Sequence, residues 1–479
     1  MSFLRTFFIR LPLLFIGATT IAGCALNAGV QQPEFEAPDA WSYAEASEAL
    51  PPSNWWKNFS SSELNEFVRR ALMLNLDLAA AAARLEKAEA QVTISGAELW
   101  PSVSLSGSAS RSGILNKSGS TQNYQAGVAA SYELDVWGGN RAARRSATAN
   151  YAAAAFDQDA VRTTVVAAVV TTYLDVLSLR QRISLAKDNL NNAEKVLAVV
   201  QSRYTYGASS SLELSQQQAQ VAGQRAALPL LIQQERERRA ALAVLLGVAP
   251  QNFVVQGESI SELTVPPTLA TMPSQVLMRR PDVQQADAKL QAAEANVVAA
   301  RAALFPSLSI GASLGWENNY SAQLFNGDPA WNLVGSVSQA LFQGGRLKAT
   351  TKAARASYDE LAANYVQTIL SALSEADAAL SNVNTLKERG RWQIDQETYS
   401  SKSYELAKTQ YQAGSVDLLT VLYAQVTLFN NQDAVLQNRV AQMQSLVTLY
   451  RVLGAVPEDI SHVTSYSDMN TEQENVTAN

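Results

Sequence analysis

The sequence predicts a mainly α-helical protein with a β-barrel part, built from one duplicated unit of a β-hairpin and long helices. The chain has 479 residues, and several short motifs return about 205–207 residues later. Such a period is far longer than the roughly 20–50 residues of a stacked solenoid repeat. In each copy, a stretch of alternating residues typical of strands precedes a long stretch with helical periodicity. The recurring motifs are Trp100-Pro101-Ser102 with Phe305-Pro306-Ser307, Val136-Trp137-Gly138 with Leu341-Phe342-Gln343, Tyr204-Thr205-Tyr206-Gly207 with Tyr411-Gln412-Ala413-Gly414, and Leu246-Gly247 with Leu453-Gly454.

The N-terminus predicts export from the cytoplasm. Residues 1–23 have the layout of a signal peptide, with Arg5 and Arg10 before a short apolar core. The segment ends in Ile-Ala-Gly followed by Cys24, which resembles a bacterial lipobox whose cysteine becomes lipid-modified. Ala25 stands where an inner-membrane lipoprotein often has Asp, so we expect an outer-membrane destination. The alternative is an ordinary secreted protein with a chance cysteine.

The composition excludes several classes of function. The chain has one His and one Cys, which leaves no disulfide framework and no Cys/His zinc site. A Ser/His/Asp triad would require His462, which lies in a polar stretch near the C-terminus. The net charge of −6 argues against a nucleic-acid partner. We therefore expect no enzyme activity, no cofactor and no bound metal.

The chain divides into six parts by composition and by the repeat. Residues 1–23 are the signal peptide and 24–61 a lipid-anchored, extended N-terminal segment. The first repeat spans 62–250, an equatorial linker 251–273, the second repeat 274–457, and a polar tail 458–479. Each repeat is expected to begin with a helical segment, interrupted at Asn75 in the first copy and restarting at Pro281 in the second.

Each repeat should contain one β-hairpin, at about 102–136 and about 307–342. Apolar residues alternate there with Ser and Gly over strands of about ten residues, which is the length of a membrane crossing. Glu133 and Asp135 are expected to share the polar face of the second strand. A half-exposed soluble hairpin gives the same alternation, so the strands alone leave both interpretations open.

Long helices should follow each hairpin, at about 141–204 and about 346–411. The strand-to-helix turns contain Gly138, Gly139, Gly344 and Gly345. The helices should end at Gly207 and Gly414, which are placed for a left-handed C-cap. Return helices begin near Leu212 and Val416, and Gly223 with Pro229 predicts a kink or break in the first. Apolar residues at intervals of seven predict coiled-coil packing between neighbours.

The strands and helices together predict a shared assembly. Four strands cannot close a membrane barrel, since the smallest use about eight. Open edges are not tolerated in lipid, so membrane strands would have to come from several chains. Three copies would give about 12 strands, and helices on the order of 100 Å long would continue them as a tube.

The sequence resembles a known family, the TolC-type outer-membrane efflux channels. The closest likeness is to their lipoprotein branch that serves resistance-nodulation-division (RND) pumps, the NodT-like outer membrane factors. The likeness covers essentially the mature chain. It implies a homotrimer with a 12-stranded outer-membrane barrel and a periplasmic α-helical barrel. It also implies a periplasmic adaptor and an inner-membrane RND-type pump as partners. The matching segments are the Cys24 lipobox, Trp55–Phe59, Leu277–Val283, Ala303–Ser307, Tyr411–Gly414 and Leu449–Gly454.

The resemblance also directs attention to the turns after Gly207 and Gly414. Relatives often carry a ring of acidic residues there that narrows the periplasmic gate, but the matching positions here are Thr420 and Tyr423. Asp417 and Glu213 are the nearby acids. The gate candidates are therefore Asp417, Tyr423 and Glu213, with Tyr423 narrowing the opening sterically. Asp417 has an equally good explanation as a residue that stabilises a helix N-terminus.

The leading functional hypothesis is the outer-membrane channel of a tripartite efflux system. It would be a passive duct that exports small molecules, such as drugs or other toxic compounds, from periplasm or pump to the exterior. One alternative is a lipid-anchored periplasmic coiled-coil scaffold or adaptor without a barrel. A second alternative is an outer-membrane duct for protein secretion.

Overall fold

The computed structural model describes residues 27–31, 33, 35–42, 51–116 and 118–458. These residues divide into two compact units. The sheet unit contains the described residues up to Phe35, together with Ala83–Ala155 and Gln285–Gln367. The helical unit contains Glu36–Ala82, Phe156–Gln284 and the described residues from Thr368 onward. Each unit is described separately.

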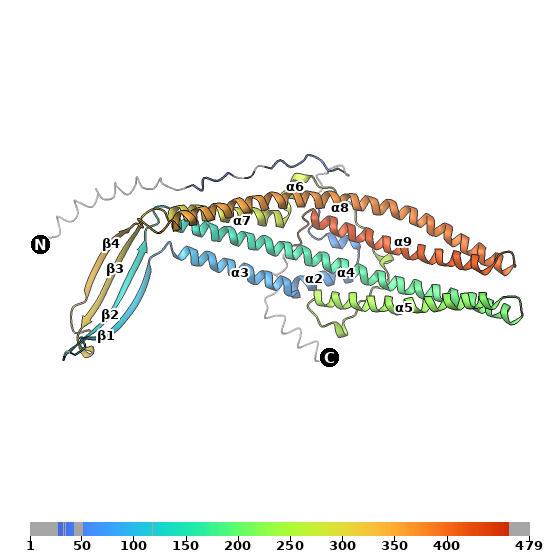
Figure 1. Ribbon diagram of the computed structural model, residues 1–479, viewed down its shortest axis with the longest axis horizontal. Helices are drawn as coiled ribbons and strands as arrows, with labels where there is room; N and C mark the ends of the chain where they lie inside the picture. The colour runs from blue at the N-terminus through green and yellow to red at the C-terminus, as the bar shows by residue number, and fades with distance from the viewer. Residues whose placement is uncertain (1–26, 32, 34, 43–50, 117, 459–479) are drawn as a thin grey trace. The chain divides into compact units, whose positions relative to one another are not determined.

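The sheet unit holds one antiparallel sheet of four strands in the order β1-β2-β3-β4 (Figure 1). Strands β1 (Ser102–Gly113) and β2 (Ser120–Glu133) form the hairpin of the first repeat. Strands β3 (Ser307–Asn318) and β4 (Ala330–Ser338) form the hairpin of the second. The two hairpins join through β2 and β3, where Tyr124 lies opposite Asn318 and Glu133 opposite Ser309. The outer edges of β1 and β4 have no partner among the described strands.

Each hairpin leads into a long helix. β2 is followed by α4 (Gly139–Thr205) and β4 by α8 (Arg346–Gln412), while α7 (Pro281–Ala302) leads into β3. In the sheet unit, Ala142 of α4, Val297 of α7 and Tyr358 of α8 share one buried cluster. This packing holds the bases of the two hairpins together.

Asp135 does not lie on the strand, so the expectation that it shares the polar face with Glu133 is wrong. Its carboxylate accepts hydrogen bonds from the backbone N–H groups of Asn140 (3.0 Å) and Arg141 (2.9 Å). It also pairs with the Arg141 guanidinium at 3.0 Å. Asp135 therefore satisfies free donors in the first turn of α4, where an acid is also favoured by the helix dipole.

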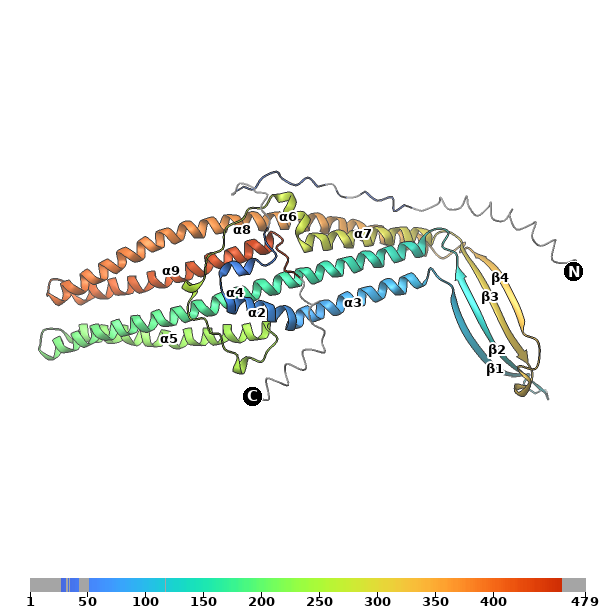
Figure 2. The same cartoon turned by 180° about the vertical axis from the view of Figure 1, so that it is seen from behind.

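The helical unit contains two antiparallel helix pairs. α4 lies beside α5 (Ser211–Leu245) and α8 beside α9 (Leu418–Val452) in both views (Figures 1 and 2). The shorter helices are α2 (Ser62–Leu74), α3 (Leu76–Ala97) and α6 (Pro273–Arg279). Of the kink or break expected in α5, a break is absent, because one helix spans Ser211–Leu245. Pro229 is exposed, so water can bond the carbonyl that loses its helical partner, and the helix continues through it.

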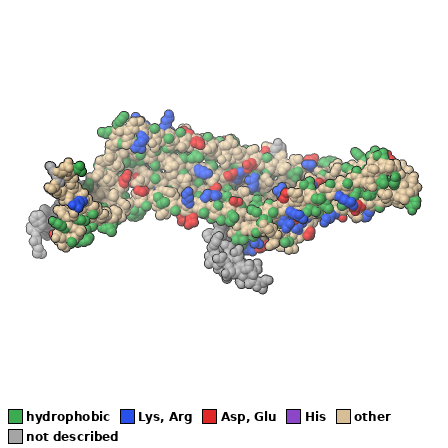
Figure 3. Space-filling model, turned by 60° about the horizontal axis from the view of Figure 1, so that its bottom comes forward, with side chains coloured by type: hydrophobic (Ala, Val, Ile, Leu, Met, Phe, Trp, Pro, Cys, Tyr) green, Lys and Arg blue, Asp and Glu red, His purple; other side chains and the backbone are tan. Residues whose placement is uncertain are grey.

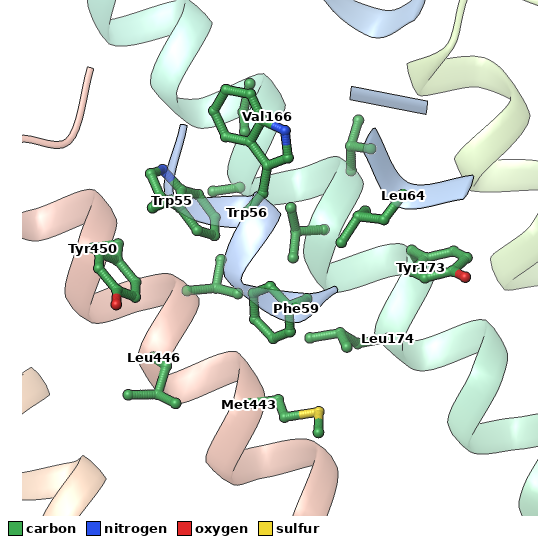
Figure 4. Packing of buried hydrophobic residues seen from close by; sticks show 14 of the residues in the cluster. Trp55, Trp56, Phe59, Leu64, Val166, Tyr173, Leu174, Met443, Leu446 and Tyr450 are labelled. Carbon is green, nitrogen blue, oxygen red and sulfur yellow. The ribbon is translucent and has the colours of Figure 1, made fainter. Parts of the chain in front are cut away.

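An aromatic core fixes the middle of the helical unit. The short 3-10 helix Trp55–Phe59 lies between α4 and α9, with Trp55, Trp56 and Phe59 turned into the cluster (Figure 4). The ring of Trp55 stacks on Tyr450 with centroids 5.5 Å apart and planes 7° from parallel. The Trp55 and Phe59 side chains are fully buried. Burial of such large rings supplies much of the packing energy of this region.

The same joint occurs once in each repeat. Gly247 follows α5 with φ +67° and lies against the Leu74 carbonyl, and Gly454 follows α9 with φ +76° and lies against Arg279. Asn75 follows Leu74 and Arg280 follows Arg279, and each donates a side-chain hydrogen bond to the end of the return helix of its copy. Asn75 Nδ2 reaches the Leu245 carbonyl at 2.9 Å, and Arg280 Nη1 reaches the Val452 carbonyl at 3.4 Å. The recurring Leu-Gly motif is therefore a packing motif.

Arg280 is the charged member of the second joint. It is 6% exposed and binds Asp282 at 2.7 Å and Glu375 at 2.9 Å. Burial alone would raise the pKa of Asp282. The hydrogen bond and charge of Arg280 outweigh that effect and hold the pKa below its usual range.

Side chains of the helices hold the linker at 251–273 in place. The Glu63 carboxylate accepts from the backbone N–H groups of Gln256 (2.5 Å) and Gly257 (3.0 Å). Arg180 donates to the carbonyls of Val255 (2.8 Å) and Gly257 (2.6 Å). Two short 3-10 helices occur here, Pro250–Asn252 at the start of the linker and Ile260–Glu262 within it.

One helix of the described residues, α4, contains a window long and apolar enough to cross a membrane. Within the protein 61% of that window is buried, as expected of a helix that packs against its neighbours.

We expect Gly454→Ala to lower the free energy of unfolding by about 2 kcal/mol, because the residue needs a left-handed backbone and has no room for a Cβ. A Cβ there would lie 3.0 Å from Arg279 Cβ. Thermal melting of the detergent-solubilised protein, followed by circular dichroism, measures the effect. Gly223→Ala is the matched control, since Gly223 lies in α5 with open space around it and should gain helix propensity. Equal melting of the Gly454 variant and wild type would contradict this role.

We expect Asp282→Asn to destabilise the protein at neutral pH by about 1 kcal/mol, since Arg280 keeps Glu375 as a partner. Because the folded pKa is lowered, the stabilisation is present above the usual Asp value of about 3.9 and is lost as pH falls through the folded value. The deficit in melting temperature should therefore shrink below about pH 4. The exposed loop variant Asp328→Asn is the control. A deficit that does not change with pH would exclude this electrostatic origin.

Candidate functional site

The sheet has one apolar and one polar face. Residues opposite each other on neighbouring strands point to the same side. Val128 lies opposite Leu105 and Leu314, so these three side chains share a face. Most of this face is exposed in the sheet unit, with Leu105 82% exposed and Val128 45% exposed. The large apolar residues on it are Val103, Leu105, Val128, Leu308, Ile310, Leu314, Trp316, Trp331, Leu333 and Val337.

The opposite face carries small and polar residues, and Val334 is the one large apolar side chain on it in these four strands. Ser106 lies opposite Gly127, and Gly127 lies opposite Gly315, where a Cβ would come within 2.8 Å of the Leu314 carbonyl oxygen. An apolar face backed by a Ser- and Gly-rich face is the pattern of a membrane barrel wall. A contiguous exposed apolar face of this kind indicates contact with lipid or another chain.

The junction between strands and helices joins the two repeats. Trp137 stacks on Phe305 with centroids 4.8 Å apart and planes at 23°. Its Nε1 also donates to the Pro306 carbonyl at 2.7 Å. The counterparts of these two rings in the other copy are Phe342 and Trp100. They are 90% and 74% exposed, without a ring partner in the described chain.

The predicted strand-to-helix glycines lie at this junction. Gly138, Gly344 and Gly345 have φ of +76°, +56° and +84°, a backbone region that disfavours other residues. Gly139 is the first residue of α4, and a Cβ on it would lie 3.2 Å from that of Ala302.

The turns at the ends of the helix pairs are alike in backbone. Gly207 and Gly414 both have φ +75°. Beyond them, Ala208 N–H donates to the Arg203 carbonyl (2.7 Å) and Ser415 N–H to the Gln410 carbonyl (2.8 Å). These bonds form the Schellman motif, which ends α4 and α8.

The acidic gate candidates are helix caps in this structure. Glu213 accepts from the Ser209 hydroxyl and from the Ser210 backbone N–H (3.1 Å), and Ser210 caps α5 in return. Asp417 caps α9 by accepting from the Thr420 hydroxyl (2.6 Å) and backbone N–H (2.9 Å). The Thr420 hydroxyl and N–H hold the pKa of the exposed Asp417 below its usual range. In the first turn the hydroxyl residue is the N-cap and the acid lies three residues later, and in the second turn the acid is the N-cap and the hydroxyl residue lies three residues later.

One cation joins the two helix pairs near these turns. Arg203 of α4 donates to the Tyr411 carbonyl of α8 at 2.8 Å and lies 4.6 Å from the centre of its ring. Tyr411, Val200 and Leu418 belong to a buried apolar cluster that fills the same region. The ends of α4, α5, α8 and α9 therefore form one packed tip, defined by residues 196–214 and 404–429.

Tyr423 lies on the outside of that tip and is 77% exposed. Leu419 (59%) and Val426 (39%) lie on the same face of α9, at spacings of four and three residues. Sequence patterns did not single out Leu419 and Val426, because α9 carries apolar residues on nearly all sides. Its exposed apolar residues therefore cannot be told from its buried ones by spacing alone. The position of Leu419 and Val426 relative to the gate candidate Tyr423 is the signal that could have revealed them.

Cys24 lies outside the described residues. Among the residues that are described, no group of three or more His, Cys, Asp or Glu side chains is arranged to hold a metal ion. On the face drawn in Figure 3, acidic and basic side chains are interspersed along the helices, without a large patch of one sign.

Comparison with known proteins places this arrangement in a family. The outer membrane efflux protein family matches residues 67–248 and 272–455, which is one match for each repeat. The pyoverdine export outer membrane protein OpmQ of Pseudomonas aeruginosa is 38% identical over 454 residues, covering 92% of this chain and 94% of that protein. The probable outer membrane lipoprotein SilC of Salmonella typhimurium is 28% identical over 457 residues, covering 93% and 98%. The solved outer-membrane channel OprN has a TM-score of 0.80 at 28% identity, covering 89% of this chain and 99% of that chain.

These matches confirm the predicted family, fold class and outer-membrane location, and they disfavour a scaffold without a barrel. The apolar sheet face, the duplicated helix pairs and the two family matches agree with one another. The chain therefore belongs to the outer membrane efflux protein family, and it is the outer-membrane channel component of an efflux system.

Proposed function

We propose that three copies of this chain form one closed barrel of twelve strands and act as a passive duct without enzymatic activity. The observation that carries the proposal is the four-stranded sheet with an exposed apolar face and two unpaired edges. An unpaired backbone group in lipid costs several kcal/mol, so the edges need partners there. Three copies pair every edge and give an even strand number within the range of bacterial barrels.

A passive duct needs an energised partner, which we propose to be an inner-membrane pump of the RND type with its periplasmic adaptor. The motifs shared with the lipoprotein branch of the family support this choice. The packed tip is the part of the helical unit that we assign to the periplasmic end of the duct. Its apolar residues Leu419, Tyr423 and Val426 are exposed on the surface of one chain.

We further propose that Cys24 carries the lipid anchor. Arg301 binds the Asn27 carbonyl at 2.6 Å, and Arg355 binds the Gly29 carbonyl at 2.5 Å. Arg301 lies near the end of α7, shortly before β3 begins at Ser307. Asn27, three residues after Cys24 in the sequence, is thereby held near the base of the sheet. That is where the surface of the membrane would meet the barrel. The naming of SilC as a probable lipoprotein is consistent with this anchor.

The cargo we propose is small molecules. OpmQ, the relative at 38% identity, is named for the export of pyoverdine. A duct that binds no cargo chemically leaves selection to the pump, so the class of cargo is set by size and by the partner.

The topology predicts that the β1–β2 and β3–β4 loops lie outside the cell. A protease site inserted after Asn116 or after Gly327 should be cut on intact cells, because both loops are at the far end of the sheet from the helices. The same site inserted after Ala208, in the packed tip, is the matched control and should be cut only after the outer membrane is opened. The sedimentation mass of the detergent-solubilised protein should equal three chains. Protected loops together with a monomeric, soluble mature protein would refute the duct.

We propose that the exposed ring of Tyr423 narrows the opening of the duct at the tip, the region where the family resemblance places the gate. We expect Tyr423→Ala to raise single-channel conductance in planar bilayers, because an exposed ring is removed from each copy. Asp417→Ala tests the electrostatic contribution of the cap, and Tyr399→Ala is the control, with a ring 73% exposed on α8 away from the turn. Unchanged conductance in both the Tyr423 and Asp417 variants would reject this assignment of the gate.

A further inference from the structure

The helical unit contains two separate buried apolar clusters, the aromatic core around Trp55 and the cluster that fills the packed tip. Among the described residues, no member of either cluster lies in the parts of the helices between them. We call these parts the polar band. It comprises residues 178–195 of α4, 215–241 of α5, 384–403 of α8 and 430–439 of α9.

Within the polar band, the α8–α9 pair has no apolar interior. The residues of these two helix segments that are buried there are Gly390, Ser400, Asn431 and Asn438. Asn431 Nδ2 and Asn438 Oδ1 have no hydrogen-bond partner within the chain. A region with few buried apolar contacts opens locally more easily than the packed regions on either side of it.

Two clefts of about 690 and 340 Å³ lie along the polar band, and polar side chains line much of both. Between them, the guanidinium of Arg182 on α4 binds the carboxylate of Asp433 on α9 at 2.5 and 2.9 Å. Polar contacts beside open clefts can be replaced by water when helices shift, whereas close apolar packing transmits the shift. The two helix pairs are therefore joined more loosely in the band than in the core or the tip.

The backbone of α8 has its weak point in the same band. Gly390 lies in the interior of the helix, where glycine is less favourable than alanine. The amides of Asn438 and Gln442 occupy the space of the missing side chain, and both donate to the Leu386 carbonyl, at 3.1 and 2.9 Å. In a regular helix that carbonyl accepts from the N–H of Gly390. It keeps two other donors when α8 bends at this point, which is how a side chain beside the helical ladder permits a kink.

The backbone of α5 is weakened at the same height. Pro229 has no N–H group, so the Arg225 carbonyl loses its helical partner. Arg225 binds Glu194 of α4 at 2.6 Å, and Glu235 of α5 binds Arg180 of α4 at 3.2 Å. Pro229 lies between these two contacts in α5, so it is level with the polar band of α4.

The two copies of the repeat place their weak points in different helices. α4 and α8 have 67 residues each, and α5 and α9 have 35, so the copies correspond one to one at an offset of 207 residues. The counterpart of Gly390 is Ile183, and that of Pro229 is Leu436. Each pair thus has one weakened helix and one regular helix, and the regular helix keeps the pair continuous.

Resting on the proposed duct, we propose that the polar band is a hinge about which the packed tip tilts as one body. The apolar cluster of the tip contains residues of α4, α8 and α9, and Leu214 of α5 packs against it. Arg203 joins α4 to α8 within the same tip. These contacts couple the two helix pairs there, so both pairs bend together. In a ring of three copies, the tilt changes the distance between the tips and with it the width of the periplasmic opening.

Spin labels at the turns test the hinge in the full-length protein in lipid nanodiscs. One label on each chain, at Ala208→Cys or at Ser415→Cys, reports the distances between copies, and the unsubstituted protein reports any labelling of Cys24. Pro229→Leu restores the helical hydrogen bond of α5. Gly390→Ala with Asn438→Ala stiffens α8, because removal of the Asn438 amide makes room for the new Cβ. Each should narrow the distance distribution at both label positions.

Matched controls separate stiffening from the added side chains. Ala227→Leu adds a leucine to the exposed surface of α5 and keeps Pro229. Gly96→Ala makes the glycine-to-alanine change in α3, where the new Cβ would lie at an ordinary contact distance of 3.6 Å from Arg144. Both controls should keep the wild-type distributions. Unchanged distributions in the stiffened variants overturn the hinge, and narrowing at only one label position shows that the helix pairs bend separately.

Hydrogen exchange gives a second readout that does not depend on the trimer. In the wild type, the backbone amides of 384–403 should exchange faster than those of 368–383 and 404–412 in the same helix. Gly390→Ala with Asn438→Ala should slow exchange in 384–403 about fivefold, from the gain in helix propensity. Equal protection along α8 in a protein that sediments as a trimer overturns the hinge and leaves the duct standing. A protein that sediments as a monomer overturns the proposed homotrimer instead.

Discussion

The constraint on which this structure depends is that backbone hydrogen bonds cannot be left open in lipid. Water is absent from the bilayer core, so each unpaired N–H or carbonyl costs several kcal/mol. The four-stranded sheet has two such edges, on β1 and β4, and an apolar face that is stable only in lipid or against another chain. One chain therefore supplies only part of a barrel, and its edge strands β1 and β4 need partner strands from other chains.

Much of the fold follows from the sequence because its signals are local and strong. The switch from alternating to helical periodicity at each Pro places the strands. A run without Pro or Gly predicts the first long helix at 141–204, and α4 spans Gly139–Thr205. The failures have local physical causes. Pro229 is exposed, so α5 continues through it although the residue has no backbone donor. The Asp135 carboxylate accepts hydrogen bonds from the first turn of α4, and the residue lies beyond the end of β2.

The candidate site is less predictable, because it depends on which residues meet. Sequence alone identifies Trp137, Phe305, Trp100 and Phe342 as recurring aromatics. It does not say that the first two stack and that the other two stay exposed. The acids near the tip are visible as charges, but the bonds of Glu213 to Ser210 and of Asp417 to Thr420 depend on the turn geometry. Leu419 and Val426 are hidden in a helix that is apolar on most sides.

The pairing of Tyr124 with Asn318 has a consequence for how the chain folds. The hairpins and the helix pairs are local, so they can form early. Strands β2 and β3 are separated in sequence by α4, α5, the linker, α6 and α7. Contacts so distant in sequence form slowly. Until β2 and β3 pair, each hairpin exposes its apolar face and its two outer strand edges to the solvent. This is the state most prone to aggregation. The sequence distance between β2 and β3 thus lengthens the time for which the apolar hairpins are exposed.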